Sequence, residues 1–385
     1  MRLLMISGDR QVAIGETGPF HALQREFSRH FERIDVICPR PSKAPTVKVI
    51  HDNVHLHPAG VARSGMMKYV FEKGRELLAE HGATLITSHD YGWFYNGMGA
   101  ARLSKETGVP YVSELHHVPG HPVAADMRER FDKRIARAYV RYALSRALAF
   151  RVVNRVEMPS LLRSWGVPDE KILVLPSLYI DLDVFRVADP RPAPRYDVCF
   201  VGRMVNNKGL SRIVDALALL AREQKGHSAI FIGKGPLLGA TRKRVERRGL
   251  GASTHFIEWV ASPAELAEIY RSSRVVVCAS TCEGGPRFTV EAMACGTPVV
   301  STRVGVMSEL LRSGENGELV DFDTADLARG LGKVLADETQ RARLGLRAAR
   351  DAQRFEYKRT IQQYAEGLKA LVTPTKVRGK AAGEA

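Results

Sequence analysis

The feature that most constrains the fold is an alternation of short apolar runs with longer helical patterns, repeated along nearly the whole chain. A helix is expected from about residue 20 to 30. In the first half, strands are expected at residues 3–6, 34–38, 85–88, 111–115 and 151–153. Strands that alternate with helices are typical of β-α-β units. The pattern therefore predicts an α/β fold with a parallel sheet covered by helices on both faces.

A proline-rich break at about residues 175–195 separates two such series. The second series predicts strands at 197–201, 228–232, 254–257, 274–279 and 298–301, and helices at 210–223, 325–337 and 338–355. We expect two doubly wound, Rossmann-like domains that face each other across a cleft. The predicted segments are a first domain of residues 1–178, a second of 179–355, a last helix at 356–372 that packs back on the first domain, and a disordered basic tail at 373–385.

Cysteine usage and charge narrow the setting of the protein. The chain has an odd number of cysteines and no Cys-x-x-Cys pair, so each is expected as a small buried residue in a reducing cytoplasm. No apolar run is long enough for a signal peptide or a membrane span. The formal net charge of +15 predicts a polyanionic partner.

The segment from Glu283 to Glu291 is the strongest candidate for a ligand site. It follows a predicted strand, and Gly284 and Gly285 allow a tight turn with close approach of a ligand. A short helix then begins, and its N-terminus is a ready anion site. The two carboxylates can accept hydrogen bonds from sugar hydroxyls. In the simpler interpretation, Glu283 is solvated and Glu291 caps a turn.

A second loop after a strand carries Arg203 and Lys208 and also opens a helix. A guanidinium fork and an ammonium ion on one loop can clamp a diphosphate and stabilise it as a leaving group. Solvated basic residues would be the simpler reading. Gly233 begins a glycine turn after the next strand, and Trp259 or Val260 can face a nucleobase, although core packing explains those two residues about as well.

These segments, taken in this order, resemble the retaining glycosyltransferases of family 4, which have the two-Rossmann-domain architecture called GT-B. The sequence Ala-Met-Ala-Cys-Gly-Thr-Pro-Val-Val, which follows Glu291, belongs to the same resemblance. It implies that Arg203 and Lys208 hold the donor diphosphate, that Glu283 contacts the transferred sugar and that Glu291 contacts the ribose. It also implies that the backbone N–H groups of Arg287, Phe288 and Thr289 reach sugar or phosphate oxygens, that no metal is required, and that transfer retains the anomeric configuration by front-face displacement.

The first half resembles the family less closely. Family members often have a Gly-Gly pair in the first loop, whereas here Gly15 and Gly18 are separated, and Gly18 is the candidate for approach to the phosphates. The family commonly places a histidine at a strand end near the reacting sugar. His116 fits that position best, and His117 is the alternative.

A run of basic residues between Met127 and Arg155 accounts for much of the positive charge. One helical stripe is expected, with apolar or aromatic surface from Tyr139, Tyr142, Leu148 and Phe150 beside it; its arginines are Arg130, Arg134, Arg137 and Arg141. Such a helix suits the anionic inner face of a membrane, and a solvated face paired with Glu129 and Asp132 is an equal alternative. Nucleic acid ranks last as a partner, because no nucleic-acid motif accompanies the charge.

The sequence thus predicts an enzyme that moves a hexose from a UDP-, GDP- or ADP-sugar to a hydroxyl acceptor, with a lipid-linked or cell-envelope glycan as the expected acceptor and no cofactor. Two alternatives stay open. One is a nucleotide-sugar epimerase on the same fold, which needs no acceptor. The other is a non-catalytic protein that binds a nucleotide sugar or a polyanion. The donor base, the sugar and the linkage are not specified by these motifs.

Overall fold

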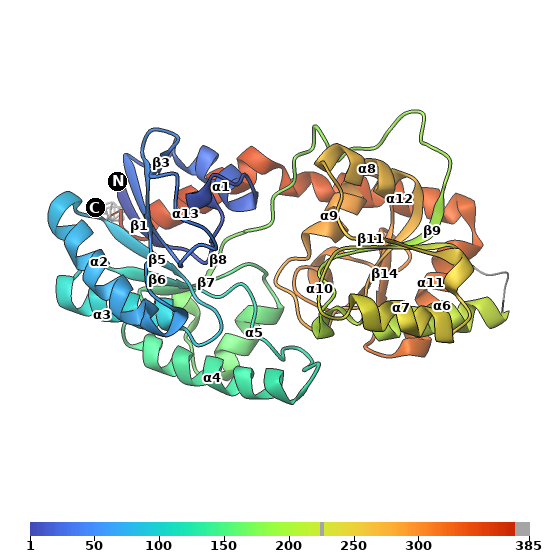
Figure 1. Cartoon of the computed structure of the whole chain (residues 1–385), viewed down its shortest axis with the longest axis horizontal. Coiled ribbons are helices and arrows are strands. Elements are labelled where there is room, and N and C mark those ends of the chain that lie inside the picture. The colour runs from blue at the N-terminus through green and yellow to red at the C-terminus, as the bar shows by residue number, and fades with distance from the viewer. Residues whose placement is uncertain (224–226, 374–385) are drawn as a thin grey trace, which may run out of the picture.

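A computed structural model describes residues 1–223 and 227–373, and it consists of two α/β domains that lie side by side (Figure 1). The first domain is built on an eight-stranded sheet with the order β3-β4-β2-β1-β5-β6-β7-β8. All neighbouring pairs are parallel except β3 and β4. The strands are β1 (Arg2–Ile6), β2 (Arg33–Cys38), β3 (Val49–Ile50), β4 (Val54–Pro58), β5 (Leu85–His89), β6 (Tyr111–Glu114), β7 (Ala149–Val152) and β8 (Ile172–Val174).

Helices cover both faces of this sheet because successive side chains of its strands point to opposite sides and most of them are apolar. One face packs against α1 (Pro19–Phe27), and the other packs against four helices. These four are α2 (Met66–His81), α3 (Tyr95–Thr107), α4 (Met127–Leu144) and α5 (Glu157–Ser164). The predicted doubly wound arrangement of the first domain is confirmed.

The second domain has a fully parallel six-stranded sheet with the order β11-β10-β9-β12-β13-β14. Its strands are β9 (Tyr196–Val201), β10 (Ala229–Ile232), β11 (Thr254–Ile257), β12 (Ser273–Cys278), β13 (Val299–Thr302) and β14 (Gly317–Val320). Its helices are α6 (Leu210–Glu223), α7 (Leu238–Arg247), α8 (Pro263–Arg271), α9 (Arg287–Ala294), α10 (Met307–Leu310), α11 (Thr324–Ala336) and α12 (Glu338–Ala352). Strand order reverses between β9 and β12, and the loops after these two strands carry the candidate donor residues.

The last helix, α13 (Tyr357–Ala370), returns to the first domain, as predicted (Figure 1). Its buried residues Ile361, Tyr364 and Leu368 join the core between β1, β2 and α1. The chain between the domains contributes to both cores, with Tyr179 on the first side and Leu178 on the second. The linker is therefore packed into the cores of both domains. The domain boundaries predicted at residues 178 and 355 stay predictions.

Some expected elements differ from the observed ones. The helix expected at 20–30 ends at Phe27, and the helix expected at 338–355 ends at Ala352, followed by a 3-10 turn. Four strands were not anticipated: β3, β4, β8 and β14. They are short or only partly buried, so the apolar pattern is weak there. The predicted tail lies outside the described residues beyond Thr373.

Candidate active site in the interdomain cleft

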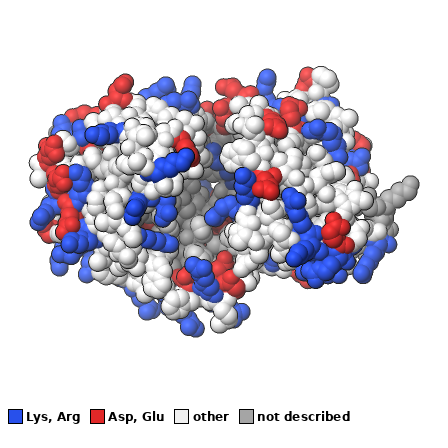
Figure 2. Space-filling model, in the orientation of Figure 1, with Lys and Arg blue, Asp and Glu red and all other residues white. Residues whose placement is uncertain are grey.

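A cavity of about 400 Å³ opens at the carboxyl edge of the first sheet, where the two domains meet. Its walls come from the loops after β1, β5 and β6, from the start of α1, from α13 and from the linker. Arg287, at the first position of α9, lines it from the second domain. Figure 2 shows the hollow between the domains, with Lys and Arg side chains beside it. The cleft predicted from two doubly wound sheets is therefore present.

His116 lies in this cavity and is held by a buried ion pair. The guanidinium of Arg151 donates to Glu114 at 3.1 Å and approaches His116 Nε2 at 3.3 Å. Because a guanidinium has no lone pair to accept with, Nε2 must be the acceptor, which places the imidazole proton on Nδ1. Burial, His89 and Arg151 together lower the pKa of His116 well below its usual value, so the ring is neutral at pH 7.

Helix α13 also supports His116, through Tyr364, which contacts both Glu114 and Arg151. The hydroxyl of Tyr364 donates to Glu114, and its ring lies under the guanidinium of Arg151 at 3.6 Å from the centroid. Arg151 also donates to the Pro176 carbonyl at 2.7 Å. All three side chains, Glu114, Arg151 and Tyr364, are at least 94% buried. This network fixes the tautomer and the position of the histidine.

Sequence reasoning missed this supporting network. A usable signal existed, because Arg151 is a charged residue inside the apolar strand Ala149–Val152 and Glu114 directly follows the buried Ser113. Charges are rarely fully buried unless they are paired. The partner on α13, however, lies 250 residues away in the chain, and no local pattern identifies it.

His117 lies on the other side of the same turn and is exposed to the cleft. Partial removal from water lowers its pKa, and the charges of Glu283, Lys208 and Arg203 also act on it. His116 therefore faces the first-domain cavity, whereas His117 faces the charged loops of the second domain.

Lys208 and Glu283 form an ion pair across the two candidate donor loops. Their side chains are only 11% and 14% exposed, and Ser280 donates to the same carboxylate at 2.8 Å. Glu283 is thus not a solvated loop residue. Arg203 is exposed on the same loop as Lys208. The fold brings together two of the residues that were selected from separate motifs.

Glu291 lies inside α9 and is 8% exposed. The hydroxyl of Tyr270 donates to its carboxylate at 3.1 Å, and burial raises its pKa. No side-chain cap is formed at the start of α9, where Pro286 precedes the helix, so Glu291 does not cap that turn. Thr289 is also fully buried, and both its hydroxyl and its N–H are directed to the Pro286 carbonyl. Its N–H is therefore less available to a ligand than those of Arg287 and Phe288.

The glycine loop of the second domain packs directly on the first domain. A Cβ at Gly284 would lie 2.3 Å from the His116 carbonyl oxygen, and the thiol of Cys282 lies 3.1 Å from the Val118 carbonyl. Gly285 is less constrained, with Leu178 as its nearest neighbour. Close contact between the domains is therefore sufficient to require glycine at position 284.

Glu157 makes a further contact across the cleft. Its carboxylate accepts the Gly305 N–H at 2.7 Å, and its side chain is buried. Burial raises its pKa to about 7, and the nearby charge of Glu283 adds to the shift. A buried carboxyl group with a pKa raised toward neutrality thus lies between the two domains, and no local sequence pattern identifies it.

The remaining glycine candidates occupy different environments. Gly233 has φ +136°, and a Cβ there would meet the Gly202 carbonyl at 2.0 Å, so the turn after β10 lies against the loop that carries Arg203. Gly18 is the residue before α1, and a Cβ there would meet nothing within 4 Å. Its position next to the cavity residue Pro19 leaves room for a ligand.

Trp259 is 76% exposed, so core packing is wrong as its explanation. Val260, by contrast, is partly buried against the second-domain core. An indole exposed to this extent next to the carboxyl end of β11 is available for stacking against a planar ligand.

The basic helix predicted near residues 127–155 is α4, and its four stripe arginines are exposed. Two of the aromatic residues assigned to its surface were placed wrongly. Tyr139 is 5% exposed and donates to Asp90, and Phe150 is fully buried in β7, because both belong to the core side of their elements. Tyr142 and Leu148 are exposed.

Within the described residues, no ion pair joins the arginine stripe of α4 to Glu129 or Asp132, and no helix there is long and apolar enough to cross a membrane.

All five cysteines are buried and free, as predicted; they are Cys38, Cys199, Cys278, Cys282 and Cys295. In the part of the chain that the structure describes, no group of three or more His, Cys, Asp or Glu residues is arranged to hold a metal ion.

Two Rossmann-like domains that face each other across such a cleft define the GT-B class of glycosyltransferases. Residues 183–351 match the family model described as glycosyl transferases group 1, and residues 20–177 match the glycosyl transferase 4-like domain. The D-inositol 3-phosphate glycosyltransferase of Arthrobacter sp. (strain FB24) is 31% identical over 310 residues, which are 75% of this chain and 70% of the relative. The chain belongs to the group 1 glycosyl transferases, of the family 4 type.

Other relatives and solved structures agree with this assignment. The D-inositol 3-phosphate glycosyltransferase of Corynebacterium jeikeium (strain K411) is 28% identical over 96% of both chains. Sucrose-phosphate synthase from Thermosynechococcus elongatus superposes with a TM-score of 0.79 at 20% identity, covering 96% of this chain and 98% of that one. Anabaena HepE in complex with UDP and glucose gives 0.74 at 20% identity, covering 96% and 100%. These structural matches show the shared fold.

Proposed function

We propose that this glycosyltransferase moves a hexose from a nucleoside diphosphate sugar to a hydroxyl group of its acceptor, with retention of the anomeric configuration and without a metal ion. The observation that carries the proposal is the Lys208–Glu283 pair, which lies beside the His116–His117 turn. Cations for a diphosphate, a carboxylate for sugar hydroxyls and a neutral imidazole thus meet at one cleft. HepE, which shares the fold, is described in complex with UDP and glucose.

The positively charged groups of the second domain form the proposed binding site for the donor diphosphate. Lys208 and Arg203 would hold the diphosphate, with the N-terminus of α9 adding the partial positive charge of its N–H groups. A diphosphate would compete with Glu283 for the Lys208 ammonium, and the released carboxylate would accept hydrogen bonds from the sugar hydroxyls. Glu291 would accept from the ribose, and Trp259 or Val260 would contact the base. Gly18, Gly233, Gly284 and Gly285 would let backbone approach the ligand.

The transfer step can be written without a covalent enzyme intermediate. The bond between the anomeric carbon and the diphosphate oxygen breaks, and its electron pair leaves with the diphosphate. The acceptor hydroxyl oxygen forms the new bond on the same face, and its proton passes to the departing phosphate oxygen. Lys208 and Arg203 stabilise the charge that develops there, which is the work a metal ion does in other transferases. His116 would donate from Nδ1 to a sugar hydroxyl and so orient the reacting ring.

The decisive experiment compares donor binding and turnover. A thermal-shift screen of UDP-, GDP- and ADP-sugars should identify one base, because a ligand at about 100 times its Kd stabilises the folded state by about 2.7 kcal/mol. Lys208→Ala and Glu291→Ala should then abolish transfer while the far-ultraviolet circular dichroism stays unchanged. Lys68→Ala removes an exposed lysine of α2 and serves as the matched control. Full activity in both cleft variants would refute the proposal. An isomerised nucleotide sugar formed without any acceptor would indicate an epimerase instead.

We further propose that the protein acts in the cytoplasm, at the inner face of a membrane, on a lipid-linked or cell-envelope acceptor. The support is the exposed arginine stripe of α4 together with exposed Met127 and Phe131 on the same helix. Charge and apolar surface on one helix favour binding to anionic lipid. Sedimentation with anionic liposomes tests this, and absence of binding even at low salt would contradict it.

A further inference from the structure

The side chain of Arg287 reaches from the second domain into the first. Arg287 is the first residue of α9 and is half-buried, and it lines the cavity that also contains His116. Its guanidinium lies over the ring of Tyr179, 4.3 Å from the ring centroid. The donor contacts proposed above use only the backbone N–H group of Arg287, so they do not account for this placement of the side chain.

The guanidinium of Arg287 occupies a position that is electrostatically unfavourable unless another group compensates for it. The N-terminus of a helix carries partial positive charge, so a cation there is destabilising. Within residues 1–223 and 227–373, no carboxylate lies within 4.0 Å of this guanidinium. The carboxylate of Glu291, one turn further along α9, accepts from Tyr270 instead. The electron-rich face of the Tyr179 ring is therefore the contact that compensates the charge.

Tyr179 is a fixed part of the first domain, although it lies in the chain between the domains. Its side chain is 6% exposed, and its hydroxyl donates to the carbonyl of Pro19 at the start of α1. Its ring meets the ring of Tyr357 edge-on, at a centroid distance of 5.4 Å. The hydroxyl of Tyr357 donates to the Ala22 carbonyl, so the linker, α1 and α13 are held together. A side chain that lies on Tyr179 is thereby tied to the first domain.

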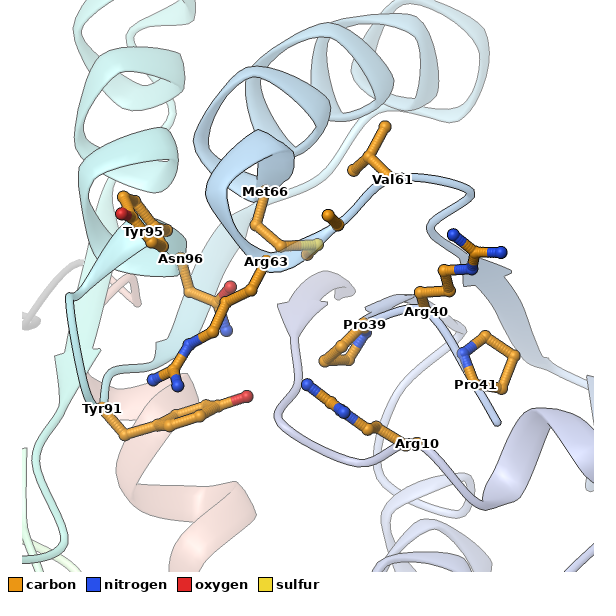
Figure 3. A pocket seen from close by; sticks show the side chains of 11 residues that line it. Arg10, Pro39, Arg40, Pro41, Val61, Arg63, Met66, Tyr91, Tyr95 and Asn96 are labelled. Atoms are coloured by element: carbon orange, nitrogen blue, oxygen red, sulfur yellow. The ribbon is translucent and has the colours of Figure 1, made fainter. Parts of the chain in front are cut away.

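This contact differs from two other arginine–tyrosine pairs of the described chain, because it joins two domains. In Figure 3, Arg63 lies over Tyr91 at 5.5 Å from the ring centroid, on the wall of a pocket of about 290 Å³ formed entirely by the first domain. Arg146 lies over Tyr142 at 4.2 Å, near the C-terminal end of α4. Neither of these pairs can hold one domain against the other, whereas the contact between α9 and the linker can.

Fixing Arg287 also fixes the helix that carries the proposed donor contacts. Arg287 and Glu291 are one turn apart and therefore lie on the same face of α9. The loop before α9 touches the first domain at Gly284, next to the His116 carbonyl. A single contact would let α9 pivot about that point, whereas a second contact at Arg287 fixes the direction of the helix as well. The donor groups of α9 are thus held in one orientation toward the His116 cavity.

We infer that Arg287 is a positioning residue for sugar transfer, and that its contact with Tyr179 aligns the donor helix α9 with the His116 cavity. The inference rests on the proposed function and adds a residue to that same site. Alignment of reacting groups affects the rate steeply, since a displacement of about 1 Å can cost about 100-fold. The N–H groups of α9 remain in any side-chain variant, so loss of the guanidinium should lower kcat and leave the affinity for the nucleoside diphosphate nearly unchanged.

A double-mutant cycle in the full chain tests the inference. Arg287→Met, Tyr179→Leu and the double variant are compared with the wild type for UDP affinity, by calorimetry, and for kcat. Turnover is measured as UDP released from UDP-glucose with water as the acceptor, or with the corresponding GDP or ADP compounds if the screen selects that base. Each single substitution should lower kcat about 10-fold, and the double variant should lose no more than about 10-fold, because both remove the same contact. The Kd for UDP should stay within about 2-fold throughout.

Arg287→Lys separates the cation–π contact from the rest of the side chain. Lysine keeps a cation that can lie over the Tyr179 ring, so this variant should turn over at least about 3-fold faster than Arg287→Met. The comparison needs no change at Tyr179, so it remains decisive if Tyr179→Leu fails to fold. Arg146→Gln removes a matched cation from the ring of Tyr142 and should change neither kcat nor the Kd for UDP.

The outcomes separate this inference from the proposed function. Wild-type kcat in Arg287→Met, equal kcat in Arg287→Lys and Arg287→Met, or a loss of about 100-fold in the double variant would overturn the inference and leave the proposed function intact. UDP affinity weakened about 10-fold with unchanged kcat would also overturn it, since Arg287 would then be a ligand of the diphosphate. A wild type that binds no nucleoside diphosphate, or binds one without turnover, would contradict the proposed function itself.

Discussion

Tyr364→Phe tests whether α13 supports the active site as well as the fold. The substitution removes one hydroxyl and keeps the ring under Arg151, so the cation–π contact at 3.6 Å remains. It leaves one oxygen of Glu114, a buried carboxylate, without its donor. Hydrogen bonds to charged groups contribute about 1.5–3 kcal/mol, so unfolding of the first domain should become easier by that amount. For a domain of about 150–250 residues this corresponds to about 3–12 °C in Tm, at about 2–4 °C per kcal/mol.

The assay is differential scanning calorimetry combined with sugar-transfer kinetics. Tyr111→Phe is the matched control, because the Tyr111 hydroxyl is also buried but has no hydrogen-bond partner within the described chain. It should change the stability by less than about 1 kcal/mol. Tyr364→Phe should also lower kcat. Without the Tyr364 hydroxyl, Glu114 and Arg151 shift, and Arg151 no longer holds His116 Nε2 as a hydrogen-bond acceptor. Equal Tm values for the two variants, or a loss of stability with unchanged kcat, would refute the claim that α13 positions His116.

Three further predictions concern the contact between the domains and the donor base. Burial raises the folded-state pKa of Glu157 to about 7, so the free energy of unfolding of the wild type should fall as the pH rises from about 4.5 to 7, by an amount on the order of 3 kcal/mol. Glu157→Gln should flatten this pH dependence in unfolding curves measured across the same range. Gly284→Ala should lower the free energy of unfolding by about 1–3 kcal/mol and remove most of the activity, because its Cβ meets backbone of the other domain. The control Gly239→Ala, whose Cβ meets nothing within 4 Å, should be neutral or slightly stabilising in the same calorimetric assay. Trp259→Ala should leave Tm within about 0.5 kcal/mol of wild type and weaken nucleoside diphosphate binding about 10-fold if the indole stacks on the base, and an unchanged Kd would exclude that role.

Much of the second domain could be predicted because its information is local. Strand β11 and helix α6 begin and end where the apolar periodicity predicts. The loops that carry Lys208 and Glu283 follow strands, and the carboxyl ends of parallel strands meet at one edge, so their proximity follows from the order of elements. Short edge strands such as β14 were not predicted, because a four-residue run with a glycine and a glutamate has little apolar pattern.

The basic helix shows where local reasoning fails. The spacing of its arginines identified the exposed stripe correctly, but the same sequence could not tell which aromatic residues point inward. The hydroxyl of Tyr139 donates a hydrogen bond to Asp90, which directly follows strand β5. This partner makes burial of the Tyr139 side chain favourable. A polar aromatic residue is therefore assigned to surface or core only when its hydrogen-bond partner is known.

The sequence by itself determined the two parallel-sheet domains and the loops that face the cleft, because hydrophobic periodicity and glycine turns act over a few residues. Only the tertiary structure decided how His116 is supported, since Glu114, Arg151 and Tyr364 come from β6, β7 and α13 and meet through packing across the whole chain. Charge and hydrogen bonding act over a few ångströms in space, and the fold alone sets which distant residues come within that range.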